Sequence, residues 1–238
     1  MMPGQLVKAV AIALDVPEET VVQHDRNLAV AGLRTTGGRG RSAPSVTHRD
    51  AAHLIASILG SVKVKDSASV VEQLDQAKAL TKRKDYATLP FPRVVELPES
   101  HSFIDALTAI IEEADTPQMF EDFPEFARRF GNLWISSSGF EGHILHLPER
   151  KVLAERGLLK SQIDISYLRP SPATASRSTG KSGFSDFWEW SFYLGLEQER
   201  KIRGNCLMIL GLCFQKGSPT SREAAFRTWK AAAKKAVA

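Results

Sequence analysis

The sequence predicts an α+β fold in two parts: a small N-terminal unit built mainly of helices, and a larger domain of mixed helices and strands. Two observations predict this fold class. Near the N-terminus, apolar residues recur at the three- and four-residue spacing of helices. In the second half, the stretches LWISS, GHILHL and QIDISYL have the composition of strands. The chain of 238 residues is 43% hydrophobic, which is enough for one large core or two small ones.

The N-terminal unit opens with two predicted helices joined by a tight turn. The first covers residues 5–15 and carries apolar residues at helical spacing. Asp15 can cap the second helix, and Pro17 suits its first turn, where the missing N–H costs nothing. The second helix covers residues 17–31 and Gly32 ends it. Two helices joined in this way have the spacing of a helix-turn-helix.

A loop rich in glycine and arginine follows these helices. Residues 33–36 and 45–47 can form two short strands, with GGRGRSAP between them as the loop of a hairpin. Thr47 and Asp50 match a capping box, which opens a helix with apolar residues at helical spacing over residues 51–59. The order helix, turn, helix, strand, basic loop, strand, helix predicts a winged helix in which this loop is the wing.

A resemblance rests on the stretch ALDVPEETVVQHDRNLAVAGLRTTGGRGRSAPSVTHRDAAHLI. Thr20-Val21, Leu28, Ala31-Gly32-Leu33 and the glycines and arginines of residues 37–41 follow the family pattern, while Asp25 stands where an apolar residue is common. The stretch resembles the winged helix-turn-helix of bacterial and phage-type transcriptional regulators. The resemblance covers about the first 60 residues, a quarter of the chain. It implies that double-stranded DNA is the partner.

The chemistry of DNA recognition selects the candidate contact residues. A helix in the major groove reads base edges through paired donors and acceptors, so Gln and Asn suit adenine, and Arg suits guanine or a phosphate. A wing supplies cations to the backbone or the minor groove, and its glycines allow close approach. The predicted DNA contacts are Thr20, Gln23, His24, Arg26, Asn27, Arg34, Arg39, Arg41 and Ser42. The alternative is that these are ordinary surface residues of a winged helix that contacts a protein.

The rest of the chain is predicted to hold a linker and a second domain, beginning after a first domain of residues 1–61. Residues 62–100 carry a helix from Ala68 to Leu80 and then LPFPRVVELP, whose prolines predict an extended linker. Residues 101–238 are predicted to form an α+β domain, with a helix over residues 102–113 and the three strands named above. We expect this domain to serve homo-oligomerisation or contact with a protein partner.

Charge is distributed unevenly along the chain. The net charge is +4, of which residues 1–65 carry +3, residues 90–150 carry −7 and residues 151–238 carry +8. Basic ends around an acidic middle suit a nucleic-acid partner that is bound at one or both ends.

Several classes of protein and site are not expected. No apolar run reaches the roughly 18 residues of a membrane span, and the N-terminus makes a poor signal peptide. Cys206 and Cys213 lie seven residues apart in an apolar run, where a helix would bury both; two cysteines are too few for a metal site or a disulfide framework. We therefore expect a reduced, cytoplasmic protein. No nucleophile, base and orienting group occur at a catalytic spacing, so neither a catalytic site, a metal nor a cofactor is expected.

Together these features predict a sequence-specific DNA-binding transcriptional regulator of bacterial or phage type. A phage-type DNA-packaging or replication accessory protein with the same DNA-binding module is the alternative. An enzyme whose site lies in the C-terminal half is a third class.

Overall fold

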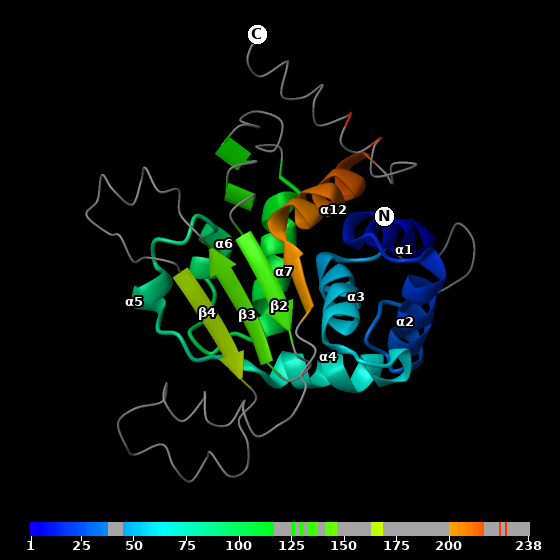
Figure 1. The fold of residues 1–238 in the computed structure, drawn as a ribbon, viewed down its shortest axis with the longest axis horizontal. Helices are drawn as coiled ribbons and strands as arrows, with labels where there is room; N and C mark the ends of the chain where they lie inside the picture. The colour runs from blue at the N-terminus through cyan, green and yellow to red at the C-terminus, as the bar shows by residue number, and fades with distance from the viewer. Residues whose placement is uncertain are drawn as a thin grey trace.

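The structure is a computed structural model in which helices pack beside and against an antiparallel sheet (Figure 1). The predicted α+β class is confirmed. The residues described are 1–37, 45–116, 125–126, 129–130, 133–137, 141–146, 163–168 and 200–216, with Ala224 and Arg227. The described helices are α1 (Pro3–Leu14), α2 (Glu18–Val30), α3 (His48–Gly60), the 3₁₀-helix η2 (Val64–Asp66), α4 (Ser67–Gln76), α5 (Arg83–Tyr86), α6 (Pro92–Val95), α7 (Phe103–Ala114) and α12 (Gly204–Lys216).

The two predicted N-terminal helices are present as α1 and α2. Asp15 has the left-handed backbone conformation (φ 59°, ψ 45°), and its N–H bonds to the carbonyl of Ala11, which ends α1. Pro17 then directly precedes α2. The predicted capping box of α3 is also confirmed, because Thr47 accepts a hydrogen bond from the backbone of Asp50 and the Asp50 carboxylate accepts one in return.

The two strands predicted on either side of the basic loop do not form. Residues 33–37 and 45–47 have no strand structure. The reason is that their backbone groups bond elsewhere: the N–H of Val46 donates to the carbonyl of Met1 at 2.9 Å, and the N–H of Thr35 donates to the Asp50 carboxylate at 2.7 Å. The loop residues 38–44 lie outside the described residues, and with them the predicted contacts Arg39, Arg41 and Ser42.

Five strands form one sheet in the order β1-β4-β3-β2-β5, in which every neighbouring pair is antiparallel. They are β1 (Lys78–Ala79), β2 (Leu133–Ser137), β3 (Glu141–His146), β4 (Ile163–Leu168) and β5 (Arg200–Arg203). The strands predicted from LWISS, GHILHL and QIDISYL are therefore confirmed as β2, β3 and β4. Burial alternates along β3 and β4, as expected for a sheet with one face in the core.

The helix predicted from Ala68 to Leu80 ends earlier, at Gln76. Beyond it the backbone joins the sheet: the N–H of Ala79 bonds to the carbonyl of His101, and that of Leu80 bonds to the carbonyl of Ser166. These partners lie far along the chain, so local spacing could not reveal them.

A single hydrophobic core runs through the whole described fold. It includes buried residues of α1, α2 and α3 together with those of α7, the sheet and α12, and α7 packs against α3, α4, α6 and α12. The predicted domain boundary at residue 61 therefore falls inside a shared core. Independent folding of residues 1–61 stays a prediction.

The proline-rich stretch predicted as an extended linker is part of this core. Leu89, Phe91 and Val94 are buried, and α6 occupies the middle of the stretch. Prolines alone predicted extension, but Pro92 stands in the first turn of α6, where proline is well tolerated.

The C-terminal described helix, α12, fits closely against α7. Cys206 and Cys213 are both buried on it, as the helical spacing predicted, and burial raises the pKa of the Cys213 thiol to about 12. At Gly211, a Cβ atom would overlap the carbonyl group of Ala114. The missing side chain therefore permits the close approach of the two helices.

We expect Gly211→Ala to destabilise the fold by roughly 1–3 kcal/mol, because the added methyl group must push two packed helices apart. Urea unfolding of the full chain measures the change. Gly4→Ala in α1 is the matched control, since a Cβ there has nothing within 4 Å and alanine favours a helix by up to about 1 kcal/mol. Equal effects of the two substitutions would show that α12 does not pack on α7 as described.

Candidate functional site

The helix predicted to read DNA, α2, has a buried side and an exposed side. Its buried residues are Val21, His24, Asp25 and Leu28. Gln23 and Arg26 are exposed, and Thr20 and Asn27 are half-buried. Because the buried residues recur at helical spacing, the exposed pair shares the opposite side of the helix.

Two of the predicted DNA contacts bond within the protein instead. His24 is 3% exposed, and its Nδ1 lies 2.8 Å from the hydroxyl of Ser67. That hydroxyl donates its only hydrogen to the carbonyl of Val64, so His24 Nδ1 is the donor to Ser67. The Asn27 amide donates to the same Val64 carbonyl at 2.7 Å. The prediction that His24 lies on the exposed face is wrong, because α4 and η2 cover it.

Arg34, also predicted to contact DNA, pairs with a carboxylate of α2. Its Nε lies 3.0 Å from Oδ1 of Asp25, and the side chains are 16% and 12% exposed. Burial raises the pKa of Asp25, the Arg34 guanidinium opposes that shift, and the nearby Asp50 adds to it. The acidic residue at position 25 therefore has an ion-pair partner within the protein.

Asp50, in the first turn of α3, binds the chain on both sides of the basic loop. One carboxylate oxygen accepts from the N–H of Thr35 at 2.7 Å, and the other accepts from the N–H of Thr47 at 2.6 Å. One turn further along α3, Nδ1 of His53 lies 2.6 Å from the carbonyl of Leu33. A carbonyl only accepts, so His53 donates. We name Asp50 and His53 the loop clamp.

Burial and hydrogen bonding shift the pKa values of both residues of the loop clamp. Burial alone would raise the pKa of Asp50, but the hydrogen bonds from Thr47 and Thr35 outweigh it, and the pKa is lowered. For His53 burial dominates, and its pKa is lowered even though the bond to Leu33 opposes the shift. At neutral pH the clamp is therefore an anionic carboxylate and a neutral imidazole.

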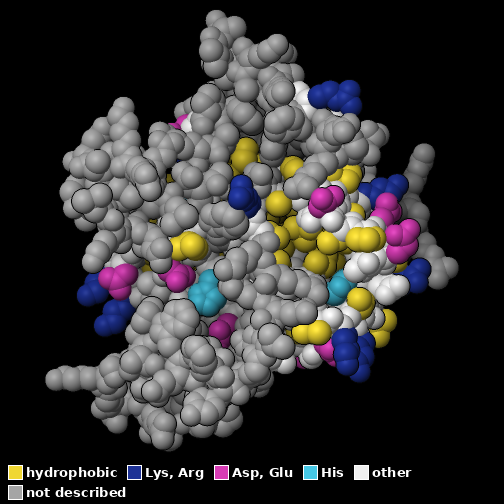
Figure 2. Space-filling view, viewed as in Figure 1, with side chains coloured by type: hydrophobic (Ala, Val, Ile, Leu, Met, Phe, Trp, Pro, Cys, Tyr) yellow, Lys and Arg dark blue, Asp and Glu magenta, His cyan; other side chains and the backbone are white. Residues whose placement is uncertain are grey.

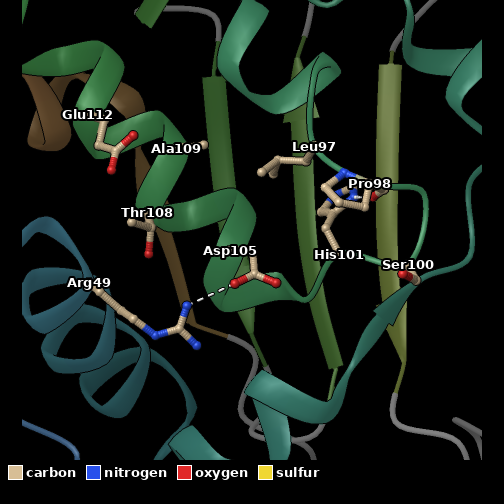
Figure 3. Close-up of a pocket in the computed structure, with 9 residues that line it drawn as sticks. All are labelled: Arg49, Leu97, Pro98, Ser100, His101, Asp105, Thr108, Ala109 and Glu112. Atoms are coloured by element: carbon tan, nitrogen blue, oxygen red, sulfur yellow. Dashed lines mark hydrogen bonds and ion pairs between the residues drawn. The ribbon is translucent and has the colours of Figure 1, made fainter.

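A groove of about 450 Å³ opens between α7, the N-terminal part of α3 and the segment after α6 (Figure 3). It is lined by Arg49, Leu97, Pro98, Ser100, His101, Asp105, Thr108, Ala109 and Glu112.

The charged groups at one end of this groove bond to one another. The Arg49 guanidinium extends from α3 and lies 2.8 Å from Asp105 (Figure 3). It also lies 2.7 Å from Asp75. The Ser102 hydroxyl donates to Asp75 at 3.1 Å. This network ties α3 to α4 and α7, so its evident role is structural.

At the other end of the groove, a histidine and a tyrosine are paired. Nδ1 of His101 lies 2.7 Å from the carbonyl of Pro98 and must donate to it. Burial lowers the pKa of His101, so the ring is neutral at pH 7 and its Nε2 accepts from the hydroxyl of Tyr167 at 2.8 Å. Both nitrogens of His101 are thus engaged within the protein.

Sequence reasoning missed these networks because their members are distant in the chain. Arg49 lies 26 residues from Asp75 and 56 from Asp105, and His101 lies 66 residues from Tyr167. The capping box at Asp50 was the one local signal, and it indicated a helix start without indicating the second bond to Thr35.

Comparisons of the chain with protein-family models, with curated proteins and with solved structures find no match. Across the described ranges, no helix combines the length and apolar character needed to cross a membrane. The same ranges hold no group of three or more His, Cys, Asp or Glu side chains that could bind a metal ion. The candidate DNA contacts on α2 and in the basic loop therefore rest on the geometry of α2 and of the loop clamp alone.

We expect Asp50→Asn to destabilise the fold at pH 7 by roughly 1–3 kcal/mol, because an amide NH₂ would face an N–H that now meets a carboxylate oxygen. The folded pKa of Asp50 lies below its usual 3.8. The stabilisation is therefore present above that pH and is lost as the pH falls through the folded pKa. Urea unfolding at a series of pH values measures the difference from the wild type.

Asp85→Asn is the control, since Asp85 is exposed on α5 and surface changes usually stay within about 0.5 kcal/mol. A wild-type advantage over Asp50→Asn that persists unchanged well below pH 4 would contradict the loop clamp.

Proposed function

We propose that this protein binds double-stranded DNA through the exposed side of α2 and acts as a sequence-specific transcriptional regulator. The observation that carries the proposal is the α1–turn–α2 pair, in which α2 is anchored by its buried side and presents Gln23 and Arg26 outward. The turn between the helices is only three residues long, which is the spacing of a helix-turn-helix.

The chemistry of this exposed pair suits base recognition. Gln23 offers an amide with one donor and one acceptor group, a combination that pairs with adenine, and Arg26 suits guanine or a phosphate. The two residues are three apart and so lie on one side of α2. An α-helix fits the major groove of B-DNA, so both side chains can reach base edges together.

The basic loop is proposed to contact the DNA backbone. Arg39 and Arg41 lie between residues 35 and 47, which the loop clamp fixes at the base of the loop. Flanking glycines allow the main chain to approach the duplex closely. Two copies bound to adjacent half-sites would gain avidity, which is the proposed role of oligomerisation.

Selection of bound duplexes from a random library with the full chain tests this function. Recovery of a common sequence supports a sequence-specific binder, and no enrichment or no binding contradicts it. Immunoprecipitation across the genome then separates a regulator, which gives discrete peaks, from a packaging or accessory protein, which gives smooth coverage.

We expect Gln23→Ala to reduce discrimination between the selected duplex and a random one by roughly 1–3 kcal/mol, while binding to random DNA changes little. Fluorescence anisotropy with both duplexes measures this. Gln76→Ala is the matched control, because Gln76 is exposed at the far end of α4. Equal losses on both duplexes would assign Gln23 to the backbone, and wild-type behaviour would remove α2 from the interface.

A further inference from the structure

The exposed side of α2 has too little positive charge to bind DNA by itself. Its first turn exposes Glu18 and Glu19, and Arg26 is its one exposed cation. On the side of the molecule where α2 lies, Lys and Arg side chains stand among carboxylates (Figure 2). Because neutralised phosphates supply most non-specific DNA affinity, cations must come from elements beside α2.

The 3₁₀-helix η2 is the element fixed alongside α2. The two pack together, and the Asn27 amide bonds to the carbonyl of Val64 at 2.7 Å. One turn earlier on α2, buried His24 bonds to Ser67, directly after η2, at 2.8 Å. Since residues 24 and 27 lie on the same side of the helix, η2 is held along one edge of α2.

The lysines on either side of Val64 are exposed at this edge. Lys63 and Lys65 are both exposed, whereas Asp66 is half-buried. Asn27 lies one helical turn after Gln23, at the border between the buried and the exposed side of α2. The hydrogen bond from Asn27 to Val64 therefore places the backbone of the two lysines beside the border of the proposed base-reading surface.

We propose that Lys63 and Lys65 contact phosphates of the duplex that α2 reads, and form with Arg26 a cationic rim around Gln23. This inference rests on the proposed DNA-binding function. It gives His24 and Asn27 a defined part in binding as positioning residues, because their contacts with Ser67 and Val64 hold the lysines in place.

The test is Lys63→Ala/Lys65→Ala in the full chain, measured by anisotropy on selected and random duplexes between about 50 and 200 mM salt. Two lost phosphate contacts should flatten the slope of log K against log salt by about 2, with similar fold losses on both duplexes. Lys82→Ala/Lys84→Ala is the control of equal charge: both residues are exposed at α5, across the molecule from α2 (Figure 1), so the wild-type slope is expected.

The outcomes separate the inference from the function it rests on. If the wild type binds the selected duplex and the Lys63/Lys65 variant keeps its slope and affinity, the lysine contacts are refuted and DNA binding stands. An equal flattening by the control variant also refutes them, because it would reflect net charge alone. If the wild type binds no duplex, both the DNA-binding function and the lysine contacts are refuted. A protein partner that then binds the wild type but not the Lys63/Lys65 variant would show that these lysines contact an acidic protein surface instead.

Asn27→Ala distinguishes positioning from direct base reading. A positioning role predicts a flatter salt slope and weaker binding on both duplexes, because η2 is released while both lysines remain. Loss on the selected duplex alone, with the slope unchanged, would instead make Asn27 a base contact and would remove it from the positioning of the rim.

Discussion

The carboxylate of Asp50 joins the chain on both sides of the basic loop to the first turn of α3. It caps α3, fixes residue 47 where the basic loop ends, and accepts a hydrogen bond from residue 35 before the loop begins. Without this side chain, the backbone donors at both ends of the loop would lose their partner. Together with the Asp25–Arg34 ion pair, this carboxylate ties the segment after α2 to both α2 and α3.

Most of the regular structure could be predicted because it follows from local chemistry. The turn between α1 and α2, the cap of α3 and the strands β2, β3 and β4 are specified by residues within a few positions of one another. The early end of α4, the edge strand β1 and the packed proline-rich stretch depend on partners much further along the chain. Helical periodicity also could not show that α1–α3 and α7 share a core, since it indicates which residues are buried and not what buries them.

The candidate site was predictable to the same extent and for the same reason. The helical wheel of α2 placed Gln23 and Arg26 outward correctly, whereas His24 was expected outside and is buried. A histidine at the edge of a helix face can lie on either side of the border, and only the position of Ser67 decides it. Arg34 was likewise expected to contact DNA, and its guanidinium pairs with Asp25 within the protein.

The contact between α1 and α12 has a consequence for how the chain acquires its structure. Six of the eight residues of α1 from Leu6 to Ala13 are buried, yet part of the cover comes from a helix that begins at Gly204. At typical rates of synthesis, these two helices leave the ribosome roughly 10–40 s apart. During that interval the apolar surface of α1 is incompletely covered, so the N-terminal helices complete their packing only after α12 has been synthesised.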